Sequence, residues 1–288
     1  MESLATLTGT LFFGAAALFA VAECLSPARA PTSPIGRRWL TNLALFFFGF
    51  LIHRMLLPFT ALIAAQAAGE LGSGLFQKLS LQAAIAVPLG VLFLDFWKYI
   101  EHRLFHGVPL LWRLHRVHHS DVDVDFTTTE RHHPLEVCVS MLFLPSAVFI
   151  LGVPDLAVGV YVLLGSIVAL FSHSNVELGP AFNRRLSWLI VTPRVHCIHH
   201  SADPPETNSN YGILLTLWDR VFKTFRQEVA KSRGRQRLGL EYFRDARSAR
   251  LDRVLLQPFL PAPTEQRPAA GQGALERGGQ AENLETWG

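Results

Sequence analysis

The sequence has few charged residues. Asp, Glu, Lys and Arg make up 17% of its 288 residues, whereas 50% are hydrophobic. Ordinary soluble domains carry about 25% charged residues. This composition excludes an intrinsically disordered chain and argues against a purely soluble enzyme. The net charge of +3 is small, and the basic residues flank apolar runs without forming one stripe, so the sequence indicates no nucleic-acid partner.

Several sequence patterns that would mark a site are also absent. The three cysteines, Cys24, Cys138 and Cys197, form no CxxC pair, so the spacing indicates neither a disulfide framework nor a zinc ribbon. There is no GxGxxG motif and no P-loop, and therefore no sign of a nucleotide site. The absence of an EF-hand loop argues against calcium.

What the sequence does contain is long apolar runs. About 20 apolar residues cross the hydrocarbon core of a bilayer as a helix. The last two runs are joined by a turn too short to hold other structure, so we expect a helical hairpin there. For the first run a cleaved signal peptide is the alternative, because AVA precedes Glu23 although no basic residue precedes the run. The four to five predicted spans are roughly Leu4–Leu25, Trp39–Ala65, Leu79–Trp97, Pro134–Leu151 and Pro154–Ser172.

The second run contains the ionisable pair His53-Arg54. Ionisable residues inside a span are functional candidates. Alternatively, the span is tilted or divided near Pro58, with Arg54 reaching toward the membrane surface. The Arg-rich loops between the runs place the N-terminus outside and the C-terminus in the cytoplasm under the positive-inside rule.

The twelve histidines are unevenly distributed, and eleven of them lie between His102 and His200. In the helix that we expect for HRLFH at 102–106, the two imidazoles share a face because they are four residues apart. HxxHH occurs twice, as HRVHH at 115–119 and HCIHH at 196–200. On a helix the first two histidines of HxxHH lie together, and the third points about 100° away. Each motif can therefore serve two metals.

Chain topology brings these motifs together. His132 and His133 precede the predicted hairpin and His173 ends it, so all three lie on the membrane face already assigned to the other clusters. A single HxxxH match is weak evidence, but repeated clusters on one face predict a dimetal site. Imidazole suits iron, zinc, copper and nickel alike. Two redox metals beside a lipid-facing cavity would suit oxygen activation.

The motifs resemble those of the fatty acid hydroxylase/sterol desaturase superfamily of integral-membrane di-iron oxygenases. The resemblance covers roughly Asp95 to Thr224. In this chain Lys223 replaces the glycine of a frequent Phe-Gly-Thr turn, and His132 stands where the family has an apolar residue, so His132 is left out of the predicted ligands. The motifs are HRLFH, HRVHH, RHHPLE, HSN, TPRVHCIHH and NYGILLTLWDRVF, in the family's order.

The resemblance implies two iron ions, O2 as co-substrate and hydroxylation of a sterol or fatty-acyl-type lipid. A lipid desaturase or an ether-lipid monooxygenase at the same site remains an alternative, and a membrane metal transporter is the alternative from another class. By analogy with the family, one metal would bind His102, His115, His118, His196 and His199. The other would bind His106, His119, His133, His173 and His200.

No flavin, nicotinamide or haem motif is visible, so the resemblance implies a separate electron-transfer protein. Basic residues on the cytoplasmic side could dock an acidic donor, or could simply reflect the positive-inside rule and attraction to anionic lipid. These residues are Arg113, Arg116, Arg184, Arg185 and Arg194.

Together these patterns predict an all-α integral-membrane bundle with a cytoplasmic helical cap that carries the His-rich dimetal site. We expect N-terminal spans over 1–78 and a catalytic domain over 79–226. A membrane-surface helical segment over 227–260, with the helix itself at Leu238–Leu260, and a disordered tail over 261–288 should follow.

Overall fold

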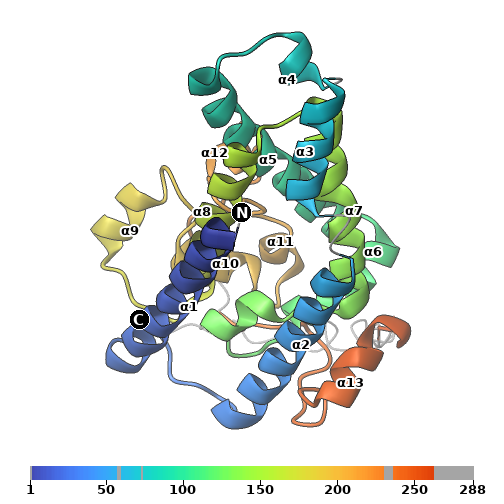
Figure 1. Ribbon diagram of the computed structural model, residues 1–288. Helices are drawn as coiled ribbons and strands as arrows, with labels where there is room; N and C mark the ends of the chain where they lie inside the picture. Colours follow the sequence, from blue (N-terminus) through green and yellow to red (C-terminus); the bar gives the residue numbers. More distant parts are fainter. Residues whose placement is uncertain (1, 57–59, 73, 230–235, 263–288) are drawn as a thin grey trace, which may run out of the picture.

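The computed structural model describes residues 2–56, 60–72, 74–229 and 236–262 (Figure 1). Over these residues the chain is helical, and three isolated bridges are the only β-pairing. The predicted all-α class is confirmed.

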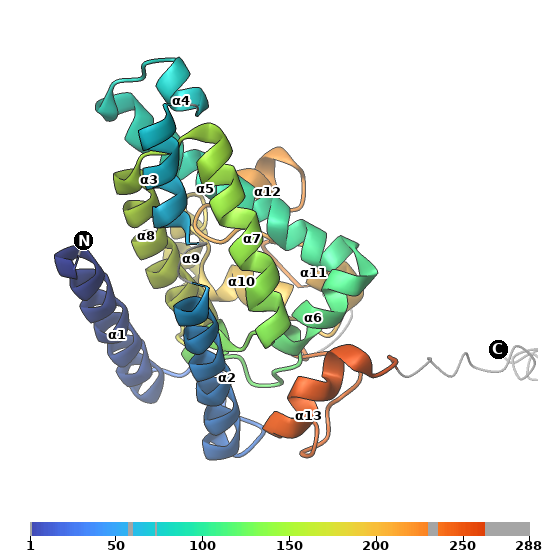
Figure 2. The ribbon, with the colours of Figure 1, turned by 45° about the vertical axis from the view of Figure 1, so that its right-hand side comes forward.

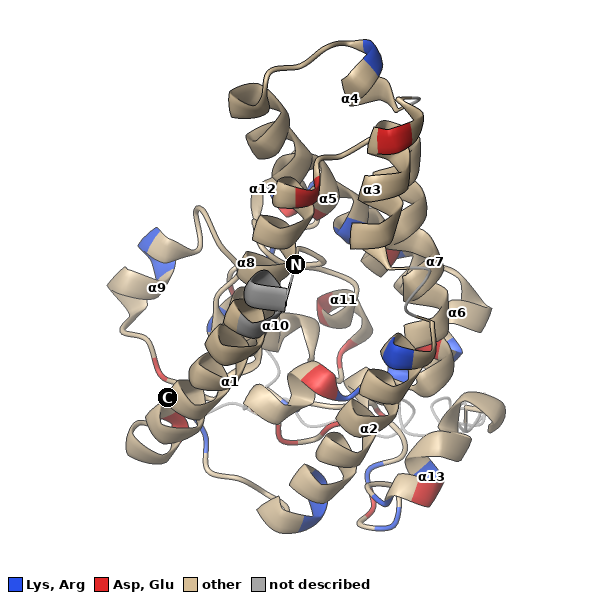
Figure 3. Cartoon of the chain, in the orientation of Figure 1, with Lys and Arg blue, Asp and Glu red and all other residues tan. Residues whose placement is uncertain are grey.

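Five helices are long and apolar enough to cross a membrane. Charged residues are sparse along them (Figure 3), as a hydrocarbon environment requires. The structure therefore agrees with a multi-pass membrane protein, with α5 extending further toward the His motifs than the predicted run. The five are α1 (Glu2–Leu25), α2 (Ile35–Met55), α5 (Ala83–Gly107), α7 (Pro134–Leu151) and α8 (Asp155–His173).

The second predicted span is divided. Helix α2 ends at Met55, and α3 (Ala61–Leu71) begins after a break, whereas Pro58 itself lies outside the described residues. Helix α3 then packs along α7 (Figures 1 and 2). His53 lies in the last turn of α2, and its Nδ1 is 2.9 Å from the carbonyl of Gly49.

Helices α7 and α8 form the predicted hairpin around Gly152. This residue has a φ of +66°, a left-handed conformation that glycine adopts without strain. Gln77 of α4 (Leu75–Lys78) donates from Nε2 to its carbonyl at 3.1 Å and leaves no room for a Cβ. The tight turn brings the start of α7 and the end of α8 to the same end of the bundle, where His132, His133 and His173 lie.

Buried polar contacts tie α2 to the segment that follows α6 (Pro109–His119). Arg131 is 1% exposed. It donates to the carbonyl of Val117 at 2.9 Å and to Oδ1 of Asn42 at 2.8 Å. Arg38 of α2 pairs with Asp121 at 3.2 Å. These bonds fix α6, which carries three predicted ligands, against α2.

The expected surface helix over 238–260 is much shorter. Only α13 (Leu251–Leu256) and the 3-10 turn η4 (Gln257–Phe259) are helical, and they lie beside the lower end of α2 (Figure 2). Val254 of α13 is buried against Leu45 and Val117, which anchors this short helix to the bundle. From residue 263 onward, the tail lies outside the described residues.

Two of the arginines considered for partner docking hold this C-terminal segment instead. Arg113 donates to the carbonyl of Pro258 at 2.6 Å, and Arg116 donates to the carbonyls of Gln257 and Leu260. Their guanidinium groups therefore serve the fold. Of the five arginines considered, the exposed ones are Arg184, Arg185 and Arg194.

Candidate metal centre

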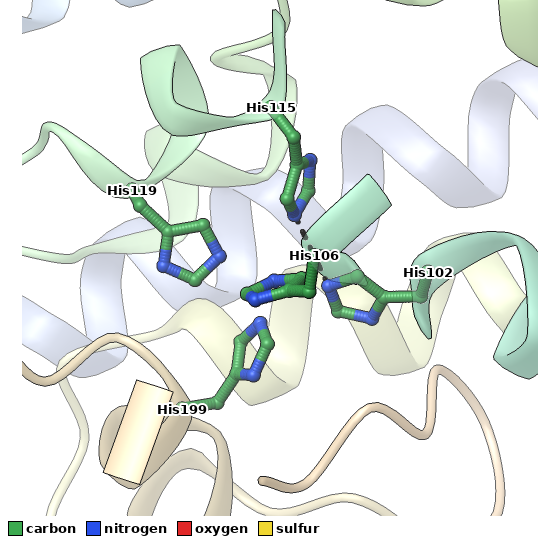
Figure 4. Close-up of side chains that lie close together, drawn as sticks. All are labelled: His102, His106, His115, His119 and His199. Carbon is green, nitrogen blue, oxygen red and sulfur yellow. Dashed lines mark hydrogen bonds between the residues drawn. The ribbon is translucent and has the colours of Figure 1, made fainter. Parts of the chain in front are cut away.

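Nine of the ten predicted ligands converge in two groups. In the first group, one nitrogen of each ring lies within 4.8 Å of the others. The rings come from α5, α6 and α10 (Pro193–His199) and point toward a common centre (Figure 4). Nε2 of His102 lies 3.1 Å from Nε2 of His115. The members of group 1 are His102, His106, His115, His119 and His199.

Group 2 lies directly beside group 1. It comprises His118, His173, His196 and His200, from α6, α8, α10 and the residue that follows α10. The Nε2 atom of His173 is 3.1 Å from that of His118 and 3.0 Å from that of His196. The rings of His119 and His200 stack with centroids 4.6 Å apart, so the two groups are in direct contact.

The converging nitrogens fit a metal ion better than a set of hydrogen bonds. Nδ1 of His173 is 2.8 Å from the carbonyl of Ala169 and must donate its proton there. Its Nε2 then presents a lone pair to the nitrogens of His118 and His196. Two imidazoles bound at right angles at about 2.1 Å from one metal would place their nitrogens about 3 Å apart, which matches the observed separations.

In group 1, buried ring nitrogens without a hydrogen-bond partner also favour a metal ion. Both ring nitrogens of His119, Nε2 of His106 and Nε2 of His199 are buried with no hydrogen-bond partner among the described residues. An unpartnered buried polar atom is costly. A cation at the common centre would accept one lone pair from each of these rings.

Backbone carbonyls orient several of these rings. Nδ1 of His102 lies 2.8 Å from the carbonyl of Tyr211, and Nδ1 of His199 lies 2.7 Å from that of Ser209. Such contacts fix the tautomer and direct the other nitrogen toward the common centre. Asp219 shapes the same loop, since its carboxylate accepts from the amides of Tyr211 and Gly212 at 2.8 Å each.

Glu136 is the carboxylate that touches the metal-site histidines directly. Its Oε1 lies 2.6 Å from Nδ1 of His115 and 3.0 Å from Nδ1 of His132. Asp95 and Asp219 bond to the neighbouring loop and not to these histidines. Asp95, for example, accepts from the amide of Leu214 and the indole of Trp218.

The structure places His132 and His133 differently from the sequence-based expectation, and neither belongs to group 1 or group 2. His133 caps α7: its Nδ1 accepts from the amide of Leu135, and its Nε2 donates to the carbonyl of Leu255. Both ring nitrogens are occupied, and His133 lies outside both groups. His132 instead stacks on His118, with centroids 4.7 Å apart and an interplanar angle of 5°.

The division of the histidines between the two groups also differs from the expected division between two metals. His115 and His119 share group 1 while His118 belongs to group 2, and His196 and His200 share group 2 while His199 belongs to group 1. On a helix, residues four apart are offset by about 40° and residues three apart by about 60°. The first and last histidines of each HxxHH motif therefore lie in one group, and the middle histidine lies in the other group.

Burial keeps several of these imidazoles neutral. It lowers the pKa values of His118, His119, His196 and His200 well below the ordinary value, and neighbouring imidazoles lower them further. Burial likewise lowers the pKa of His199 to about 3. Neutral rings keep the lone pair that metal binding requires.

A cavity of about 520 Å³ lies against both groups, which is within the size range of small-molecule sites. Group 1 contributes His102 and His115 to its wall, and group 2 contributes His118, His173 and His196. The rest of its lining includes apolar side chains of α2 and α7, among them Leu45, Phe46, Phe50 and Val137.

Comparison with known proteins agrees with this geometry. The family model described as fatty acid hydroxylase matches residues 87–224. Ornithine lipid hydroxylase OlsE of Rhizobium tropici is 34% identical over 147 residues, which are 49% of this chain and 42% of that protein. Alkylglycerol monooxygenase of Homo sapiens is 32% identical over 140 residues, 48% of this chain and 30% of that protein.

Methylsterol monooxygenase 1 of Gallus gallus is 30% identical over 138 residues, 47% of this chain and 44% of that protein. The chain thus spans less than half the length of these relatives. No solved structure gives a significant match. The matched segment contains every histidine of groups 1 and 2. Residues 87–224 form a fatty acid hydroxylase domain, the domain of the fatty acid hydroxylase/sterol desaturase superfamily.

Proposed function

We propose that this protein is a membrane-bound di-iron oxygenase that hydroxylates a C–H bond of a lipid. The observation that carries the proposal is the cavity that touches both histidine groups and is otherwise largely apolar. A lipid chain can enter such a cavity, and its C–H bonds then lie beside the metal centre. The family relationship and the lipid-oxidising relatives support the same reaction.

The ligands that we propose are the nine histidines of the two groups. Group 1 would hold one iron with five imidazoles, and group 2 would hold the other with four. His132 lies next to group 2 and is the candidate for a fifth contact there, in place of the sequence-based candidate His133. A pair of iron ions bound here would supply the redox chemistry that activates O2.

The protein's own groups position the reactants. Apolar side chains of α2 and α7 hold the lipid and exclude water, while Glu136 and the loop carbonyls keep the imidazoles in fixed orientations. The overall reaction converts C–H, O2, two electrons and two protons into C–OH and water. A separate electron-transfer protein would supply the electrons, and exposed Arg184, Arg185 and Arg194 offer it a basic surface.

We further propose that the metal centre faces the cytoplasm. The Arg-rich connections flank the end of the bundle that carries the histidines, consistent with the positive-inside rule. Cytoplasmic reductants would then reach the centre directly.

Ether-lipid oxidation is a second candidate, favoured by the similarity to alkylglycerol monooxygenases. A hydroxyl group inserted on the carbon next to an ether oxygen gives a hemiacetal, which collapses to an aldehyde and an alcohol. The same C–H insertion therefore accounts for both outcomes, and the substrate decides between them.

Heterologous expression followed by untargeted lipid mass spectrometry tests the proposal. Cells with the wild-type chain should accumulate a lipid that is heavier by one oxygen, or its aldehyde cleavage product, and cells with His199→Ala should not. Glu70→Gln, a change at an exposed residue of α3, serves as the control. A product lighter by two hydrogens would instead indicate a desaturase.

A further inference from the structure

The cavity contains a polar subsite within its apolar lining. Lys98, Glu101 and Glu130 line it together with His53, the unexplained histidine at the end of α2. Of these residues Glu101 is the buried one, and a buried ionisable side chain is costly unless its polar atoms are used. These four residues are called the head subsite below.

One carboxylate oxygen of Glu101 makes no hydrogen bond. Its Oε1 accepts from Nζ of Lys98 at 3.0 Å and from Oγ of Ser140 at 2.6 Å. Its Oε2 is buried without a hydrogen-bond partner, and the whole residue is 1% exposed. A buried carboxylate oxygen without a donor is strongly destabilising. The remaining acceptor capacity is therefore available to a donor on a ligand.

The charge of the subsite selects the kind of ligand. Lys98 neutralises Glu101, whereas the carboxylate of Glu130 makes no hydrogen bond or ion pair with any side chain that the structure describes. An acceptor-rich subsite favours hydroxyl or ammonium groups and disfavours carboxylates and phosphates.

The position of Glu101 limits where oxidation can occur. Glu101 immediately precedes the group 1 ligand His102 on α5, and both line the same cavity. A polar group held at Glu101 therefore keeps only the nearest carbons beside the metal centre. The rest of the chain would extend along Phe46 and Phe50 toward the exposed face of α2.

We propose, building on the proposed function, that Glu101 is a specificity residue that accepts a hydrogen bond from the polar head of the lipid. The substrate is then an amphiphile with a hydroxyl or ammonium head, oxidised within a few bonds of that head. Fatty acids oxidised in mid-chain do not fit this arrangement.

Binding measurements on the purified protein in detergent test this without depending on turnover. The probes share a hexadecyl chain: 1-O-hexadecylglycerol, its di-O-methyl ether, hexadecylamine and palmitate. Binding is followed by tryptophan fluorescence. The wild type should bind hexadecylglycerol or hexadecylamine about tenfold more tightly than the di-O-methyl ether and palmitate, and whichever of the two binds more tightly identifies the head as hydroxyl or ammonium.

Glu101→Gln tests the residue itself. Lys98 and Ser140 should retain the amide oxygen, which places the NH2 group where the free carboxylate oxygen lies and turns an acceptor into a donor. This variant should lose the preference, and Glu101→Leu should lose it as well. Glu70→Gln removes an exposed carboxylate and should bind like the wild type. Metal content and thermal midpoints verify that each variant is folded.

Two outcomes would overturn the proposal: equal binding of hexadecylglycerol, hexadecylamine and the di-O-methyl ether by the wild type, or an unchanged preference in a folded Glu101→Leu protein. Oxidation of any probe in mid-chain would also overturn it. Selective binding without oxidation of any lipid would leave the head subsite standing and contradict the proposed oxygenase activity instead.

Discussion

Oε1 of Glu136 lies 2.6 Å from Nδ1 of His115 and joins the first turn of α7 to the last turns of α6. The contact commits the Nδ1 proton of His115 to the carboxylate. Nε2 is then left as a lone pair in group 1, 3.1 Å from Nε2 of His102. One carboxylate thus sets both the tautomer and the direction of a proposed ligand.

Replacing Glu136 should weaken metal binding. Glu136→Ala removes the acceptor for both His115 and His132. Loss of such an orienting partner costs about 10- to 100-fold in metal affinity. Competition with a chelator, followed by metal analysis, measures this, with Glu177→Ala as the exposed control. Unchanged metal retention in Glu136→Ala would contradict the assigned role.

Replacing His132 and replacing the adjacent His133 should have different effects on metal content and stability. His133→Ala removes the cap of α7 and the contact to Leu255, which should cost about 1 kcal/mol of stability while metal content stays unchanged. His132→Ala removes a ring stacked on His118 and should lower metal content or turnover. Side-by-side metal analysis and melting curves decide between them. If His133→Ala loses metal and His132→Ala keeps it, the sequence-based ligand set holds instead.

The metal-free protein should lose stability in acid. The folded pKa values of His118, His119, His196, His199 and His200 lie below the ordinary value of about 6.5. Below that pH the unfolded chain binds protons that the folded chain does not.

The stabilising contribution of each ring is therefore complete above about pH 6.5 and falls by about 1.4 kcal/mol per pH unit below it. For His199 the loss continues until the pH approaches about 3. Thermal midpoints of the chelator-treated protein at pH 7.5, 6.5 and 5.5 measure the effect. A midpoint that is constant or rises toward pH 5.5 would show that these rings are not buried as neutral groups.

Arg131 should be among the most sensitive positions of the fold. Arg131→Met removes the guanidinium group that donates to the carbonyl of Val117 and to Oδ1 of Asn42, and it leaves Asp121 with Arg38 as its one cationic partner among the described residues. Breaking a buried charged network in this way costs about 3 kcal/mol or more. Denaturant unfolding in detergent should show the loss, whereas Arg253→Met, at an exposed arginine of α13, should be neutral. Equal stabilities would show that the network contributes little.

Much of this arrangement follows from local patterns in the sequence. Apolar runs of sufficient length predict the spans, and a tight turn between two of them predicts that the ends of α7 and α8 meet. The convergence of the His clusters follows from that topology. The break between α2 and α3 was also foreseeable, because charges at His53-Arg54 and a nearby proline interrupt the run.

The remaining features depend on tertiary contacts that spacing does not encode. The choice between His132 and His133 is decided by Leu255, which lies 122 residues from His133 and occupies its Nε2. Backbone carbonyls such as those of Tyr211 and Ser209 orient ligands without any side-chain signature. The position of the C-terminal segment depends on Arg113 and Arg116, which bind its carbonyls and fix it against α6.

Oxygen-isotope labelling tests the central claim most directly. Membranes that contain the wild-type chain and a reductant are incubated with 18O2, and the lipids are analysed by mass spectrometry. The account predicts a lipid product that carries one 18O atom per molecule and that is absent from His199→Ala membranes. A product oxygen that derives from water, or a labelled product that persists in His199→Ala, would contradict it.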